Sequence, residues 1–287
     1  MHLRGDVICL TDKVEPVGDL IAILQKAHGL DIACYSEFFL ARSFARRWQA
    51  VAGMTSAGYR QLLGRDKREA EAFVQSLSIH HSEFFRDPLV FAMLEHRLLP
   101  ALASAKEASD YPEIRVWSAG CAAGEEAYSV AILLSELRGR FDVPVRFRLF
   151  ATDSASQQLE LASAGSYASS VMGNVKLRHL ERWFARHDDT YVVASEIRRQ
   201  VDFSLHGLLD EHSISPSASI FGGFDLILCC NVLFYYRPEW QAVILDNLRG
   251  CLAPEGYLVT GEAEREIVQA AGFQPLAMPG PIFQAVR

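Results

Sequence analysis

Two carboxylates directly follow a glycine turn in the stretch "IRVWSAGCAAGEEAYSVAILL", residues 114–134. Gly120 and Gly124 form the turn, and Glu125 and Glu126 come next, at the predicted start of a helix. Turns of this kind usually bind phosphate through backbone N–H groups and the helix N-terminus. Carboxylates at a helix start suit the helix dipole, but they would repel a phosphate. A ligand without phosphate groups is therefore expected at this turn.

Another acidic residue ends the next predicted strand, because Asp153 closes "VRFRLFATD". Ligands of doubly wound sheets bind outside the carboxyl ends of the strands, where one carboxylate can accept hydrogen bonds from two vicinal ribose hydroxyls. Glu125 and Asp153 together predict a nucleoside that carries a cation. S-adenosylmethionine fits this description, since it has a ribose, an ammonium and a sulfonium. Each residue alone also fits a plainer role, Glu125 as a helix-start carboxylate and Asp153 as a turn or N-cap residue.

Short apolar runs alternate with amphipathic helices from about Ile114 onward, and this alternation positions both carboxylates. It predicts an α/β fold with a doubly wound, mostly parallel sheet. The run "FDLILCC" is almost wholly apolar, as expected of a central strand that is covered on both faces. The predicted strands are 114–119, 145–153, 201–206, 224–230 and 256–261, and the predicted helices are 125–137, 156–164 and 239–252.

Residues 1–90 are expected to form an N-terminal all-helical domain, and residues 91–287 a sheet domain. Gly29 is predicted to end the first helix, and Ser36 to cap the next one. A short strand is also compatible with residues 6–10. A small antiparallel sub-domain is predicted at about 174–203, with a helix followed by two strands joined by a short turn between Thr190 and Phe203.

Composition narrows the class of protein. The 287 residues carry a net charge of −7, which argues against non-specific binding to nucleic acid. No apolar run approaches the length of a membrane span, and the N-terminus lacks the apolar core of a signal peptide. Six cysteines show neither a CxxC pair nor zinc spacing, and His80–His81 has no third ligand nearby, so no metal is expected. A cytoplasmic monomer without membrane insertion is expected.

The motifs "SIHHSEFFRDP", "WSAGCAAGEEAYSVAILL", "FDLILCCNVLFYY" and "LAPEGYLVTGEAE" follow one another along the chain. In this order they resemble motifs of the CheR-type family of chemotaxis receptor glutamate methyltransferases. "SIHHSEFFRDP" resembles the family's "T.N.T.FFR", and "WSAGCAAGEEAYSVAILL" resembles its cofactor loop and following helix. "FDLILCCNVLFYY" resembles "CRN…YF", and "LAPEGYLVTGEAE" resembles "L.PGG.L..GHSE". The resemblance runs from about Asp19 to the C-terminus. It implies a class I methyltransferase-like fold that transfers a methyl group from S-adenosylmethionine to glutamate carboxylates of a chemoreceptor-like protein, giving methyl esters and S-adenosylhomocysteine.

The resemblance also implies roles for individual residues. Ser82 and Arg86 would reach the methionine end of the cofactor from the helical domain, and His80 would lie beside them. Glu125 would bind the ammonium group, and Asp153 the ribose hydroxyls.

The remaining implied residues lie later in the chain. Gly207, Leu208 and Asn231 would frame the adenine, with Cys230 next to Asn231. Tyr235 would stand near the transferred methyl group, so that Arg86 and Tyr235 are the catalytic candidates.

Four positions depart from the family pattern and mark a divergent member. His80 replaces an Asn, Gly207 an Asn or Asp, Cys230 an Arg, and Glu262 a His. Two alternatives follow from these changes and from the fold. One is a non-catalytic S-adenosylmethionine-binding or scaffolding protein, and the other is a methyltransferase that acts on a small molecule.

A cluster of basic residues on the second predicted helix favours a protein substrate. Arg42 and Arg46 are four residues apart and hence lie on one helix face, with Arg47 beside them. Docking of the glutamate-rich cytoplasmic region of a chemoreceptor-like protein is expected there. A merely solvated helix face explains the same pattern.

Overall fold

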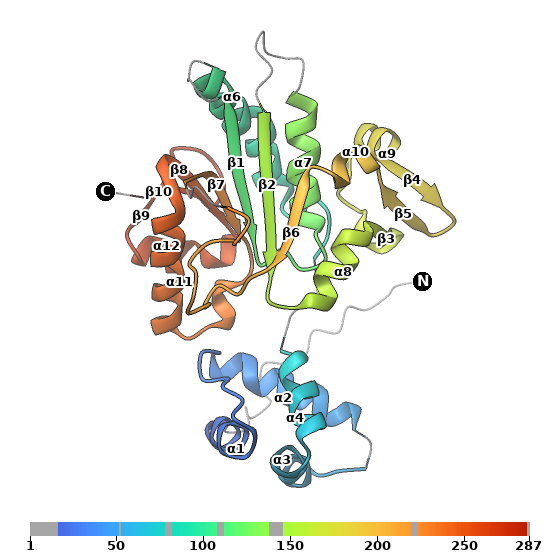
Figure 1. The fold of residues 1–287 in the computed structure, drawn as a ribbon, viewed down its shortest axis with the longest axis vertical. Coiled ribbons are helices and arrows are strands. Elements are labelled where there is room, and N and C mark those ends of the chain that lie inside the picture. The colour runs from blue at the N-terminus through green and yellow to red at the C-terminus, as the bar shows by residue number, and fades with distance from the viewer. Residues whose placement is uncertain are drawn as a thin grey trace. The chain divides into compact units, whose positions relative to one another are not determined.

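The computed structural model describes residues 17–51, 53–77, 82–107, 112–137, 146–219 and 223–285. The chain divides into two compact units, Met1–Leu77 and Ser78–Arg287, which are described separately (Figure 1). This division precedes the boundary expected at residue 90, so Ser82 and Arg86 belong to the same unit as the sheet and not to the helical one. The strand considered at residues 6–10 lies outside the described residues.

The first unit is helical, and its helix ends follow the local sequence. Gly29 adopts a left-handed conformation (φ 70°) that ends the first helix, and the Ser36 hydroxyl accepts a hydrogen bond from the Phe39 N–H at the start of the second, as predicted. Phe44 and Tyr59 are fully buried between the helices. The helices are α1 (Gly18–His28), α2 (Glu37–Ala50), α3 (Ser56–Arg65) and α4 (Lys67–Gln75).

The second unit is built on a seven-stranded sheet in the order β6-β2-β1-β7-β8-β10-β9. The first five strands of this order run parallel, and β10 runs antiparallel to both of its neighbours. The mostly parallel sheet predicted from the sequence is thus confirmed. The strands are β1 (Glu113–Ala119), β2 (Arg146–Asp153), β6 (Val201–Leu205), β7 (Phe224–Cys229), β8 (Leu252–Thr260), β9 (Phe273–Pro275) and β10 (Ile282–Ala285).

Helices cover both faces of this sheet, which makes it doubly wound. Leu94 and Val130 pack in the core on one face, and Ile244 and Val268 pack in the core on the other. Every residue of β7 is buried, as its apolar sequence predicts. The elements that cover the sheet are α5 (Pro88–Met93), the π-helical η1 (Leu94–Leu98), α6 (Leu99–Glu107), α7 (Glu125–Leu137), α8 (Ser156–Ala164), α11 (Pro238–Cys251) and α12 (Arg265–Ala270). None of the helices in the described ranges is long and apolar enough to span a membrane.

A small antiparallel sheet, made of β3 (Ser166–Ala168), β4 (Phe184–His187) and β5 (Thr190–Val193), lies beside the main one (Figure 1). Its strand order is β3-β5-β4, and α9 (Leu177–Trp183) comes directly before β4. The predicted pairing of two strands between Thr190 and Phe203 is wrong. The short helix α10 (Ser195–Arg198) separates them, and Val201–Leu205 joins the main sheet beside β2. Buried Ile197 and Val201 return the chain to the main core.

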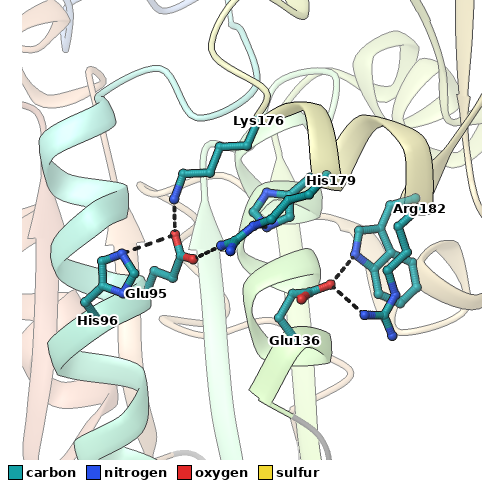
Figure 2. A network of polar contacts seen from close by, with 8 residues as sticks. Glu95, His96, Glu136, Lys176, His179 and Arg182 are labelled. Carbon is teal, nitrogen blue, oxygen red and sulfur yellow. Dashed lines mark hydrogen bonds and ion pairs between the residues drawn. The ribbon is translucent and has the colours of Figure 1, made fainter.

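Two acidic side chains of the sheet unit hold α9 in place (Figure 2). Glu95 of η1 is 7% exposed, and it accepts hydrogen bonds from Lys176 and Arg178. Glu136 of α7 accepts one from the Trp183 indole N–H at 2.8 Å, and Arg182 lies 3.2 Å from it. A buried carboxylate requires such partners. The helix of the small sub-domain is therefore fixed to α7 and η1.

Candidate active site

The turn after β1, residues 120–124, has the tight geometry that its glycines predict; we call it the cofactor turn. Gly120 and Gly124 have positive φ angles of 76° and 92°, and Ala122 has one of 47°. The Gly120 and Cys121 N–H groups donate to the Thr152 carbonyl at 2.8 and 2.9 Å. A Cβ on Gly124 would lie 2.9 Å from the Ala162 Cβ, so glycine is required there for the close approach of α8.

The Asp153 carboxylate joins this turn to the end of β2. Its Oδ2 accepts a hydrogen bond from the Ala122 N–H, and its Oδ1 accepts one from the Ala155 N–H, both at 2.9 Å. Asp153 is thus a turn residue in this structure. Each carboxylate oxygen retains acceptor capacity, and the side chain is only partly buried, so the carboxylate can also receive ribose hydroxyls.

Glu125 is buried at the start of α7. It is 4% exposed, and within the described residues its Oε2 has no hydrogen-bond donor. Burial raises the pKa of Glu125, whereas its own N–H and the Ser82 hydroxyl act in the opposite direction. An unsatisfied buried oxygen costs free energy that a cationic donor recovers on binding. The residues present therefore fit the ammonium of an amino-acid-like ligand.

Glu126 follows Glu125 at the start of α7, and its contacts were not predicted from the sequence. It accepts a hydrogen bond from the Ser118 hydroxyl at 2.7 Å. Burial raises the pKa of Glu126, while the Cys230 thiol, Ser118 and the positive charge of Arg86 lower it. Arg86 and Cys230 thus both lie near enough to Glu126 to favour its charged form. The doubled glutamate after the turn was the available signal.

Glu264 is a second residue that was missed, and it organises the segment after β7. Its fully buried carboxylate accepts hydrogen bonds from the N–H groups of Asn231, Val232, Leu233 and Gly261, at 2.7–2.8 Å. Burial raises the pKa of Glu264, and these four N–H groups lower it. The bonds hold Asn231 in a left-handed conformation (φ 61°). A Cβ on Gly261 would come within 2.4 Å of the Asn231 amide nitrogen, so a larger residue there would displace the Asn231 side chain.

The other predicted site residues also follow strand ends. The His206 N–H donates to the Asp153 carbonyl at 3.1 Å, which brings Gly207 beside the end of β2. A Cβ on Gly207 would meet only Ser154 within 4 Å, at 3.9 Å, so the fold alone does not require glycine there.

Leu208 packs against the hydrophobic core on the α11 side of the sheet. Tyr235 ends the short 3-10 helix η3 (Leu233–Tyr235), half-buried and with its ring edge-on to Phe234. His80 lies outside the described residues.

The predicted basic surface of α2 is smaller than expected. Arg47 forms two hydrogen bonds with Glu69, at 2.9 and 3.0 Å, and Glu69 also accepts one from the Tyr59 hydroxyl at 2.7 Å. Arg47 therefore pairs with a residue of its own helical unit. Arg42 and Arg46 are exposed, with Arg42 over the ring of Phe38.

The strand order, the cofactor turn, the acidic end of β2 and the buried Glu125 fit a class I S-adenosylmethionine-dependent methyltransferase. The family described as "CheR methyltransferase, SAM binding domain" matches residues 80–278. The chain belongs to this CheR methyltransferase family. The fold class, the family and the cofactor predicted from the sequence are confirmed.

Relatives agree with this assignment. The chain is 34% identical to "Chemotaxis protein methyltransferase 1" of Pseudomonas aeruginosa, over 84% of this chain and 86% of that protein. It is 31% identical to "Chemotaxis protein methyltransferase" of Escherichia coli, over 84% and 81%. It is 32% identical to an uncharacterized 104.1 kDa protein of Rhodobacter capsulatus over 96% of this chain, and it spans only 28% of that protein.

Similarity to solved structures is slight. N-methyltransferase NodS from Bradyrhizobium japonicum, in complex with S-adenosyl-L-homocysteine, shares 18% identity and a TM-score of 0.33, over 80% of this chain and 78% of that one. A likeness of this size does not bear on the function.

Proposed function

We propose that the protein transfers methyl groups from S-adenosylmethionine to glutamate side chains of a chemoreceptor-like protein in the cytoplasm. The products are glutamate methyl esters and S-adenosylhomocysteine. The observation that carries this proposal is the buried, half-paired Glu125 beside the cofactor turn, with Asp153 at the end of the neighbouring strand. Relatives named chemotaxis protein methyltransferase support the choice of substrate.

Different residues of the chain bind different parts of the cofactor. Glu125 holds the ammonium and Asp153 the ribose hydroxyls. The segment after β7, with Asn231, frames the adenine together with Gly207 and Leu208. Because Gly207 has no side chain, this position contributes no side-chain hydrogen bond to the adenine.

Methyl transfer also requires that the carboxylate of the substrate glutamate is oriented and desolvated. S-adenosylmethionine, when bound, supplies an electrophilic methyl group on a sulfonium. A glutamate has a reference pKa of about 4.3 and is ionised at neutral pH, so no general base is needed. Arg86 orients a carboxylate, and Tyr235 bounds the reacting centre. Holding the attacking oxygen in line and excluding water lowers the barrier.

The receptor docks on α2 through Arg42 and Arg46. Reversal of both charges, in Arg42→Glu with Arg46→Glu, should slow methyl transfer to receptor and leave cofactor binding unchanged. The parent rate should fall as ionic strength rises, because exposed charges are screened by salt. A double variant that works at the parent rate would remove α2 from the docking surface.

Titration calorimetry with S-adenosylhomocysteine, followed by transfer of labelled methyl to receptor cytoplasmic regions, tests the whole assignment. Binding at micromolar concentrations with base-labile label on receptor glutamates is expected. Binding without transfer to any receptor would favour the scaffolding alternative. Transfer to small molecules alone would favour the small-molecule enzyme.

A further inference from the structure

A tyrosine of the small antiparallel sheet reaches into the cofactor turn. Tyr167 lies on β3 and is 6% exposed. Its hydroxyl donates a hydrogen bond to the Ala123 carbonyl at 2.6 Å. Burial raises the pKa of Tyr167 above its ordinary value, so the hydroxyl keeps its proton at neutral pH. The small sheet therefore contributes directly to the geometry of a turn whose following residue is the ammonium-binding candidate.

The Ala123–Gly124 peptide group is held from both sides. Tyr167 binds its carbonyl oxygen, while its N–H, on Gly124, donates to the Cys121 carbonyl at 2.9 Å. Fixing this peptide plane fixes the direction in which the chain enters α7 at Glu125. Without the tyrosine hydroxyl the plane is held on one side only.

The small sheet also supports the segment that leads to Arg86. The ring of Phe84 packs edge-on against Tyr167 and against Phe184 of β4, with centroids 4.9 and 5.1 Å away. The Phe84 N–H donates to the Val171 carbonyl at 3.1 Å.

The next residue along, Phe85, is held in an unusual conformation. It has a left-handed backbone (φ 53°), and its N–H donates to the Ser129 hydroxyl at 3.0 Å. Its ring stacks on His179 of α9 at 5.5 Å. The acidic anchors Glu95 and Glu136 in turn hold α9 (Figure 2). The small sheet and α9 thus contact both the cofactor turn and the segment that leads to Arg86.

We infer that Tyr167 is a positioning residue for the cofactor turn, so that cofactor binding and the order of the small sheet are thermodynamically coupled. The inference rests on the proposed function, because it takes Glu125 to bind the cofactor. Coupling of this kind is reciprocal. If the small sheet favours the binding-competent turn, then a bound cofactor must stabilise the small sheet by the same factor.

A second buried tyrosine provides a control for the decisive variant. Tyr128 of α7 is fully buried, and its hydroxyl donates to the Ala162 carbonyl at 2.7 Å. Tyr167→Phe and Tyr128→Phe each delete one buried hydroxyl that donates to a carbonyl, but only the Tyr167 hydroxyl donates to the cofactor turn. The Ala162 carbonyl keeps the Gly165 N–H at 3.1 Å in Tyr128→Phe. Both variants keep their aromatic rings.

Calorimetric titration of the full chain with S-adenosylhomocysteine separates the two variants. Tyr167→Phe should weaken binding about fivefold or more, the size expected for a lost buried hydrogen bond. Tyr128→Phe should weaken binding less than Tyr167→Phe does, because the Ala162 carbonyl keeps the Gly165 N–H as a donor. A Tyr167→Phe protein that is folded and binds as tightly as the parent overturns the inference, and so does an equal loss in both variants.

Hydrogen exchange gives a second readout that does not depend on any variant. S-adenosylhomocysteine should slow amide exchange in residues 166–193 of the parent chain, and that protection should shrink in Tyr167→Phe. Unchanged exchange in the parent, despite measured binding, overturns the coupling while the proposed function stands. Failure of the folded parent to bind S-adenosylhomocysteine overturns the cofactor assignment and this inference with it.

Discussion

Glu125→Gln should make the protein more stable and its cofactor binding weaker. The substitution keeps the shape of the side chain and removes its charge. In the described structure Glu125 is 4% exposed, and its Oε2 has no hydrogen-bond donor. The ionised carboxylate is therefore a cost to the ligand-free fold, and it is the group that a bound ammonium would satisfy.

The two effects have opposite signs, and the effect on binding is the larger. Leaving a buried polar group unsatisfied costs about 1–3 kcal/mol, and more when it is charged. Since the amide still leaves one polar group buried, we expect Glu125→Gln to raise the free energy of unfolding by about 1 kcal/mol at neutral pH. A hydrogen bond to a charged group contributes about 1.5–3 kcal/mol, so affinity for S-adenosylhomocysteine should fall about ten- to a hundredfold.

The pH dependence of stability provides an internal check. Burial raises the pKa of Glu125 in the folded protein. Between the unfolded and folded pKa values the native state binds more protons than the unfolded state. The contribution of Glu125 to the free energy of unfolding therefore falls as pH rises through this window, and stays low above it. The Gln variant should lack this component.

Urea unfolding at several pH values, together with calorimetry at neutral pH, measures both quantities. The reasoning is refuted by a Glu125→Gln protein that is less stable than the parent and binds S-adenosylhomocysteine with parent affinity. That result would mean that the carboxylate serves the fold and not the ligand.

Three further substitutions address the other strand ends. Asp153→Ala should lower the free energy of unfolding by about 1–3 kcal/mol, because two backbone N–H groups lose their acceptor. It should also weaken S-adenosylhomocysteine binding about tenfold or more. Parent affinity in calorimetry would exclude a ribose contact. Glu264→Gln should cost about 2 kcal/mol or more in urea unfolding, since an amide NH2 would face N–H donors; an unchanged midpoint would contradict this account. Gly207→Asn should be tolerated, because the nearest atom to a Cβ there is 3.9 Å away. It should tighten S-adenosylhomocysteine binding by about 0.5–1.5 kcal/mol if its amide reaches the adenine, whereas weaker binding would argue against an adenine contact at this position.

Local patterns were enough to predict most of the sheet unit. The expected helices 125–137 and 156–164 have the observed bounds, because a glycine turn begins one and Gly165 ends the other. The five parallel strands were visible as short apolar runs between amphipathic helices. The short antiparallel strands β9 and β10 were not predicted, since three or four residues carry too little pattern.

What the sequence did not predict depends on partners that are distant along the chain. Glu264 accepts from Asn231, 33 residues earlier, and Arg47 pairs with Glu69, 22 residues later. Nothing in the spacing of either residue indicates its partner. The predicted hairpin failed because its second strand, β6, pairs with the distant β2, whereas β5 pairs with β3 and with its chain neighbour β4.

The position of β10 dictates an order of events during synthesis. β10 lies between β8 and β9, although it follows both in the chain. Until Ile282–Ala285 has left the ribosome, these two neighbours lack the strand that joins them, and the core position of Phe283, fully buried in the finished sheet, stays open. The helical unit, Met1–Leu77, has all its residues available much earlier. The helical unit can therefore fold before the sheet of the second unit does, because that sheet is complete only once β10 has been synthesised.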